Sequence, residues 1–112
     1  MPTMADRAAE ASAGPAQAAS ASVALDIGAG RGALVIYPHE RFRGGEIEIS
    51  LEHGDGRRGH TGVHERTTEA GAVLTAVFGS LAGGDYLIWE DATHTAARVR
   101  VREGTVTEVR LP

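Results

Sequence analysis

Beyond residue 22 the chain is built from short apolar runs, half of which are followed directly by a glycine or a proline. Fourteen of its fifteen glycines lie in residues 23–112. The clearest run is Glu46–Leu51, in which Ile47, Ile49 and Leu51 alternate with polar side chains, as in a half-buried strand. No segment of this region shows the apolar stripe with a 3.6-residue period that an amphipathic helix requires. Short runs of alternating apolar and polar residues, separated by turn residues, predict an all-β fold.

The runs predict seven or eight strands, a number typical of an antiparallel β-sandwich of the Ig-like kind. We expect strands at residues 23–27, 33–37, 46–51, 60–67, 72–78, 85–90, 97–102 and 106–111. The polar strand over 60–67 is expected at an edge or in an exposed position, and 79–84 as a turn. A three-residue loop with left-handed Gly104 would pair Val99 with Val109 in a closing hairpin and keep apolar side chains on one face.

Residues 1–22 have a different composition from the rest. They contain nine alanines and no aromatic residue, and Met1 and Met4 are their only large apolar side chains. Such a segment buries too little surface to offset the entropy lost on ordering. We therefore expect a disordered Ala-rich tail over 1–22 and one β-sandwich domain over 23–112, with a docked tail helix as the alternative.

Charge and composition exclude several classes of protein. The chain has 11 arginines and no lysine against 15 acidic residues, a net charge of -4, and it has no cysteine. An acidic chain lacks the basic footprint of a nucleic-acid binder, and a chain without cysteine has neither disulfides nor thiolate chemistry. It has no apolar run of about 18 residues that would span a membrane. It also lacks a signal-peptide pattern, so we expect a cytoplasmic protein.

The segment Phe78–Trp89 has a recurring arrangement. An apolar residue ends one strand, Leu81 plugs the turn, Gly83 and Gly84 permit it, and Tyr86 opens the next strand. This segment resembles a piece of prealbumin-like domains of the Cna-B and carboxypeptidase-regulatory types. The resemblance implies a β-sandwich that serves as a stalk, a ligand-presenting module or an accessory domain.

Two further resemblances imply enzymatic alternatives. Segments at 25–28, 32–34 and 46–50 are similar to those of short bacterial proteins that carry a phospholipase label, although the residues show no phospholipase site. The glycine-rich segment 25–32 resembles motif I of Rossmann-like methyltransferases, which bind S-adenosylmethionine. That motif requires a helix after the glycines, whereas residues 34–38 read as a strand that ends at Pro38. We expect a glycine-rich hairpin there.

Histidines raise the possibility of a divalent-metal site for Zn²⁺ or Cu²⁺. The candidate ligands are His53, His60 and His64, with Glu52 or Asp55 as a carboxylate ligand. On a strand, residues four apart lie about 13 Å from each other, so His60 and His64 need a bend to share one ion. The alternative is that these histidines lie on the surface and bind no metal ion.

The serines do not sit in a hydrolase pattern. Ser80 lies in Gly79-Ser80-Leu81, which is not the strained elbow of a nucleophile, and Ser50 alternates outward on its strand. No pair of histidine and aspartate is placed beside either serine by sequence spacing. We expect Asp85, Glu90 and Asp91 to be turn and rim residues rather than an acid/base pair, and no catalytic residue is assigned.

A candidate interface lies in the last third of the chain. Leu87 and Trp89 share one face of their strand, and tryptophan is enriched in binding hot spots. Arg98, Arg100 and Arg102 lie on one face of the next strand and begin a positive stripe that Arg110 would extend. The interface residues are therefore Leu87, Trp89, Arg98 and Arg100.

These observations favour a non-enzymatic interaction or accessory module without a cofactor. Its partner would be another protein, or a second copy joined through an edge strand. The alternative is a His-dependent metal-binding protein. A phospholipase-type hydrolase and an S-adenosylmethionine-binding protein are the less favoured readings.

Overall fold

A computed structural model describes residues 27–112, which form seven β-strands and one short 3-10 helix and so confirm the all-β prediction. The expected tail over 1–22 lies outside the described residues, as does most of the strand expected at 23–27. The elements are β1 (Arg31–Tyr37), η1 (Glu40–Phe42), β2 (Glu46–Leu51), β3 (Gly59–Thr68), β4 (Gly71–Ala82), β5 (Gly84–Trp89), β6 (Thr95–Val101) and β7 (Val106–Arg110).

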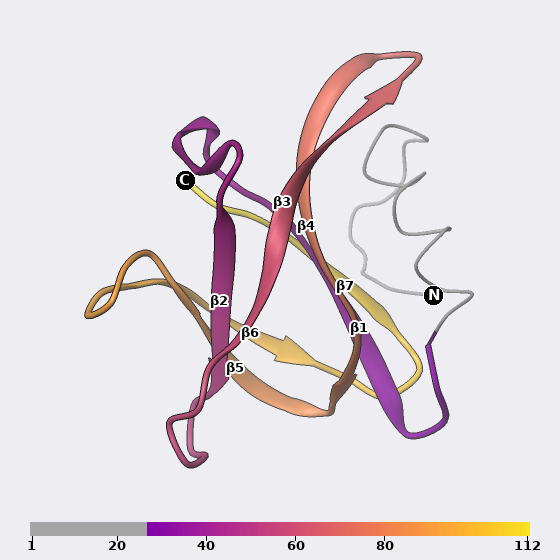
Figure 1. The fold of residues 1–112 in the computed structure, drawn as a ribbon. Coiled ribbons are helices and arrows are strands. Elements are labelled where there is room, and N and C mark those ends of the chain that lie inside the picture. The colour runs from indigo at the N-terminus through magenta and orange to yellow at the C-terminus, as the bar shows by residue number, and fades with distance from the viewer. Residues whose placement is uncertain (1–26) are drawn as a thin grey trace.

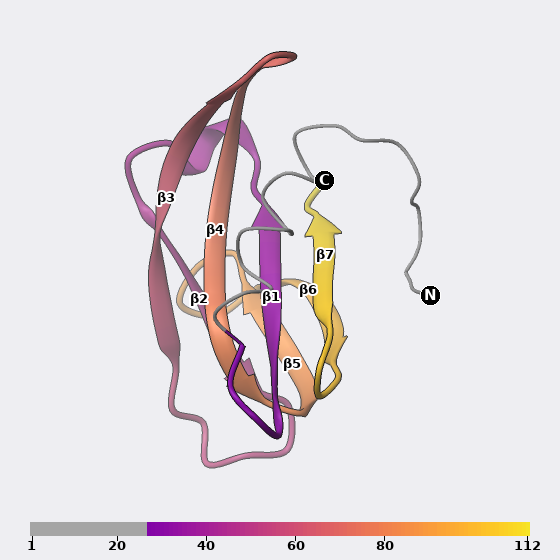
Figure 2. The same ribbon diagram turned by 90° about the vertical axis from the view of Figure 1, so that its right-hand side faces the viewer.

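The strands form one continuous sheet in the order β6-β5-β2-β3-β4-β1-β7. This sheet curls until its two edge strands, β6 and β7, approach each other, so the molecule is a nearly closed barrel (Figures 1 and 2). β7 runs parallel to β1, and all other neighbouring strands are antiparallel. The observed sheet is therefore single and mixed, rather than the two-layered antiparallel sandwich that the strand count predicted.

The predicted hairpin that pairs Val99 with Val109 is wrong. Val109 lies opposite Ile36 of β1, whereas Val99 lies opposite Tyr86 of β5. The reason is β1, which is buried on both faces and whose backbone needs a partner on each edge. β4 supplies one edge and β7 the other. The left-handed conformation predicted for Gly104 is confirmed, with φ 76°.

β3 is exposed, as predicted, but it is not an edge strand. Its first residues, 59–62, pair with β2, and residues 63–68 pair with β4. One strand thus belongs to both halves of the curved sheet and turns the corner of the barrel. Its solvent-facing side chains explain why the run is polar, and each half of the strand is paired along one edge.

The barrel interior is filled by the inward side chains of the alternating strands. Leu34, Ile36, Ile47 and Ile88 are fully buried there, and Val101 is 1% exposed. The opposite face of β1 carries a second, smaller cluster of apolar residues, namely Ala33, Val35 and Tyr37. Alternation therefore assigns β1 to two clusters, which accounts for its continuous apolar sequence.

The barrel closes at Gly32. A Cβ at this position would lie 2.2 Å from the carbonyl oxygen of Arg102, so a larger residue would clash with backbone. Two backbone hydrogen bonds join the same place, from the Gly104 N–H to the Arg31 oxygen at 2.7 Å and from the Ala33 N–H to the Thr105 oxygen at 2.9 Å. A strand follows the glycine-rich segment, as expected. Gly32 lets the backbone of β1 lie close to the backbone at Arg102.

The segment Phe78–Trp89 forms the tight connection between β4 and β5. β4 continues to Ala82, so the predicted turn over 79–84 contracts to Gly83. Leu81 packs against the core, and the Tyr86 hydroxyl donates to the Ala82 carbonyl oxygen at 2.7 Å. Leu81 therefore lies within β4 rather than in the turn, and Tyr86 is the third residue of β5 rather than its first.

Candidate functional site

The four residues predicted as an interface lie on one surface of the barrel, the solvent side of β2, β5 and β6. We call this surface the β2–β5–β6 face. Successive side chains of a strand point to opposite sides of the sheet. Tyr86 and Ile88 point into the core, so Leu87 and Trp89 point outward. Leu87 lies opposite Ser50 on one side and Arg98 on the other. Leu87 is therefore at the centre of the face, half-buried between polar neighbours.

The arginines of the face are bound to carboxylates of the same face. Arg100 donates two hydrogen bonds to Asp85, each 3.0 Å long, in a bidentate pair. Arg98 donates to Glu52 at 2.5 Å and lies 3.6 Å from Asp85. The contact with Glu52 is the main cause that raises the pKa of Arg98 above its ordinary value. The expected stripe does not continue to Arg110, which lies over the Tyr37 ring on another side of the barrel.

Trp89 is held from both sides. Its indole N–H donates to the Ser50 hydroxyl at 2.9 Å, which satisfies a buried polar group. The guanidinium of Arg58 lies over the ring, 3.7 Å from its centre, and also binds the Glu48 carboxylate at 2.9 Å. The orientation of the tryptophan ring is therefore fixed by one neutral and one charged partner.

Arg58 and Glu48 were missed by the sequence analysis. Arg58 follows a glycine-rich loop, with no signal that ties it to a tryptophan 31 positions further along the chain. The outward position of Glu48 on its strand gave no signal of a partner at Arg58. With them, the ion pairs of the face join three arginines to three carboxylates, namely Arg58, Arg98, Arg100, Glu48, Glu52 and Asp85.

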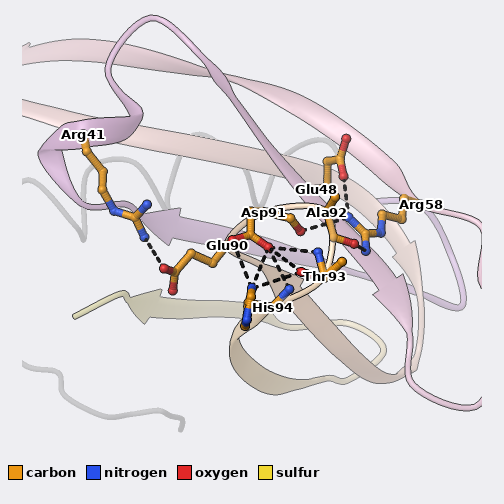
Figure 3. Close-up of polar contacts among 8 residues, drawn as sticks. All are labelled: Arg41, Glu48, Arg58, Glu90, Asp91, Ala92, Thr93 and His94. Atoms are coloured by element: carbon orange, nitrogen blue, oxygen red, sulfur yellow. Dashed lines mark hydrogen bonds and ion pairs between the residues drawn. The ribbon is translucent and has the colours of Figure 1, made fainter.

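The loop after β5 borders this face, and Asp91 organises it (Figure 3). One carboxylate oxygen of Asp91 accepts the backbone N–H groups of Thr93 and His94, each at 2.8 Å. These two bonds, followed by the His94 side chain, lower the pKa of Asp91 from 3.8 to about 2. Arg58 donates to the carbonyl oxygens of Asp91 and Ala92, at 3.2 and 2.7 Å. The expectation that Asp91 is a turn residue is confirmed, whereas Asp85 lies within β5, opposite Arg100.

The arrangement of Thr93, His94 and Asp91 is not a nucleophilic triad. The Thr93 hydroxyl and the Asp91 carboxylate both contact Nδ1 of His94, at 3.1 Å each. A triad needs the nucleophile on one ring nitrogen and the acid on the other. The contacts of this histidine instead complete the loop.

The two serines considered as nucleophiles have structural partners. Ser80 is exposed, and its hydroxyl accepts a hydrogen bond from Nε of Arg31 at 3.1 Å. Ser50 accepts from the Trp89 indole. Neither serine has a histidine among the hydrogen-bond partners found within residues 27–112.

The structure does not bring the candidate metal ligands together. Across residues 27–112, no three histidine or carboxylate side chains gather in a group that would hold a metal ion. His60 and His64 lie on β3, opposite Glu48 and Thr75 respectively. His53 lies in the loop that follows β2, and its Nε2 atom is 3.9 Å from a carboxylate oxygen of Glu52.

Comparisons with known proteins do not add a family to this geometry. No family model, curated protein or solved structure matches the chain. A separate observation is that none of the helical structure between residues 27 and 112 is long and apolar enough to cross a membrane.

Proposed function

We propose that this chain is a non-enzymatic interaction module, and that its β2–β5–β6 face binds a second copy of the same chain. The observation that carries the proposal is the position of Leu87 at the centre of the face, on the same strand as Trp89 and bordered by Arg98 and Arg100. Tryptophan and arginine are the residue types that most often dominate binding energy. The likeness of Phe78–Trp89 to prealbumin-like accessory domains supports the same kind of role.

The charges on the face favour a second copy as the partner. Three arginines and three carboxylates are paired within it, so these groups add no net charge, and Glu46 adds one exposed carboxylate on β2. In a two-fold contact each patch meets itself, and an arginine of one copy can face a carboxylate of the other. A strongly charged partner would leave half of these groups opposite like charge.

The edge strands favour the face over strand addition as the contact surface. β6 and β7 lie close to each other at the seam of the barrel, where the Thr107 hydroxyl reaches the Arg100 carbonyl oxygen at 3.4 Å. Edges that face each other are less available to another chain. The proposed association therefore uses side chains rather than a shared sheet.

Sedimentation velocity over a concentration series tests this proposal. We expect the mass to rise from 11.7 kDa toward twice that value as the concentration increases. Leu87→Glu should hold the chain as a monomer, because it places a charge at the centre of the contact. The matched control is Thr67→Glu, on exposed β3 outside the face, which should associate like the unmodified chain. A chain that stays monomeric throughout, or a Leu87→Glu variant that associates normally, overturns the proposal.

A further inference from the structure

A pocket of about 290 Å³ opens at one end of the barrel, where β2 and β4 end and β3 and β5 begin. This is the lower end in Figure 1, away from η1 and the C-terminus. The loop between β2 and β3 lies beside the opening and contributes both of its charged residues. The side chains used below are Leu51, Phe78, Leu81, Tyr86, Asp55 and Arg57.

The walls of the pocket are apolar and belong to the barrel core. Phe78 and Tyr86 are 9% and 6% exposed, and Leu81 packs against the same core cluster. Leu51 differs, because its 43% exposure makes it the one large apolar residue classed as exposed between residues 27 and 112. A ligand seated here would cover Leu51 without displacing the core. Barrel mouths lined by such residues are common sites for small molecules.

Two opposite charges line the pocket without neutralising each other. The Asp55 carboxylate accepts the backbone N–H of Arg57 at 2.9 Å, a bond that shapes the loop. The Arg57 guanidinium has no hydrogen bond or ion pair with any residue of the described chain. Its neighbour Arg58, by contrast, binds a carboxylate, two carbonyls and an aromatic ring. The pocket thus has the Arg57 guanidinium without a partner among the described residues, and the Asp55 carboxylate with one of its two oxygens already accepting a hydrogen bond.

We propose that this pocket binds a small zwitterion with an apolar body, of the class of free apolar amino acids. The ligand carboxylate would pair with Arg57, its ammonium group with Asp55, and its side chain would cover Leu51. The volume is about twice the ~150 Å³ of a cavity that admits benzene, which leaves room for one ring and a short charged end. A ligand with a carboxylate alone would meet repulsion from Asp55, and one with an amine alone would meet repulsion from Arg57.

Titration of the full chain followed by ¹H–¹⁵N NMR tests this site with three matched probes. They are phenylalanine, 3-phenylpropionate, which lacks the ammonium group, and 2-phenylethylamine, which lacks the carboxylate. We expect saturable shifts of amides around Leu51, Asp55 and Tyr86, with phenylalanine binding tightest. Arg57→Gln should weaken phenylalanine binding about tenfold, the change expected on losing one charge-assisted contact. Asp55→Asn should weaken it while keeping the oxygen that accepts the Arg57 N–H.

Two controls make the result specific. Arg41→Gln removes an arginine of η1, at the other end of the barrel, and should leave phenylalanine binding unchanged. Leu87→Glu, which tests the association of chains, should also leave it unchanged, so the two proposals fail or succeed separately. The pocket proposal is overturned by shifts that do not saturate, by equal binding of all three probes, or by an Arg57→Gln variant that binds phenylalanine as before.

Discussion

The guanidinium of Arg58 lies 3.7 Å from the centre of the Trp89 ring and joins four parts of the barrel. The same side chain binds Glu48 on β2 and the carbonyls of Asp91 and Ala92 in the loop after β5. Arg58 itself leads into β3. A planar group with several donors makes these contacts at once, which a lysine ammonium group does not reproduce.

Replacement of Arg58 by alanine should therefore destabilise the fold by about 1–3 kcal/mol, through lost hydrogen bonds and lost cation–π contact. Arg58→Lys should recover only part of this. Urea unfolding followed by the fluorescence of Trp89, the single tryptophan, measures both. Arg57→Ala is the matched control, since its guanidinium has no described partner, and it should stay within about 0.5 kcal/mol of the unmodified chain. An Arg58→Lys variant as stable as the unmodified chain would show that the planar guanidinium geometry contributes nothing to stability.

Gly32→Ala should be more damaging than its size suggests. The added methyl group would lie 2.2 Å from the Arg102 carbonyl oxygen and 2.9 Å from a methyl group of Val101, where the barrel closes. Overpacking against backbone forces β1 and β6 apart, and we expect a loss of about 3 kcal/mol in thermal unfolding. Gly79→Ala is the control, because nothing lies within 4 Å of its added methyl group. It should be neutral or gain about 0.5 kcal/mol by restricting the unfolded chain. Equal effects of the two substitutions would exclude close approach as the reason for Gly32.

Local alternation predicted the strands well and their long-range pairing poorly. The bounds of Glu46–Leu51 were predicted to the residue from its period of two, although burial departs from that period at the end, where Ser50 is buried and Leu51 is exposed. The partner of β7 was predicted wrongly, because Val109 continues an apolar face equally well whether it lies opposite Val99 or opposite Ile36. Only the need of buried β1 for two partners decides between them, and that need is a property of the whole sheet.

The same limit applies to the candidate site. Leu87, Trp89, Arg98 and Arg100 were predicted because strand period and residue type are local properties. Arg58 was not, because its contact with Trp89 depends on how the loop before β3 returns to the sheet. Of the pocket charges, Asp55 was considered only as a metal ligand, and Arg57 was visible only as a member of a polar loop.

Addition of Zn²⁺ tests the metal-binding alternative raised by His53, His60 and His64. A site saturated a hundredfold above its Kd would add about 2.7 kcal/mol of stability. For a domain of this size that raises the melting temperature by roughly 10 °C or more. We expect no such rise, because no group of three ligands forms within residues 27–112. EDTA-treated protein and a His60→Ala/His64→Ala variant are the controls. A rise that disappears in this variant would establish a histidine site and contradict the expectation.

The Asp91 carboxylate should make the β5–β6 loop sensitive to acid. Its pKa is lowered from 3.8 to about 2, first by the Thr93 N–H and then by the N–H and side chain of His94. A carboxyl group whose pKa is lower in the folded state stabilises that state above its ordinary pKa, and this contribution is lost as the pH falls from about 4 to 2. Asp91→Asn keeps an oxygen acceptor for the two N–H groups but does not titrate. The stability difference between the two proteins should therefore shrink over this interval. NMR titration of the Asp91 carboxyl carbon gives the midpoint directly, and a midpoint near 3.8 would mean that the loop hydrogen bonds do not form in solution.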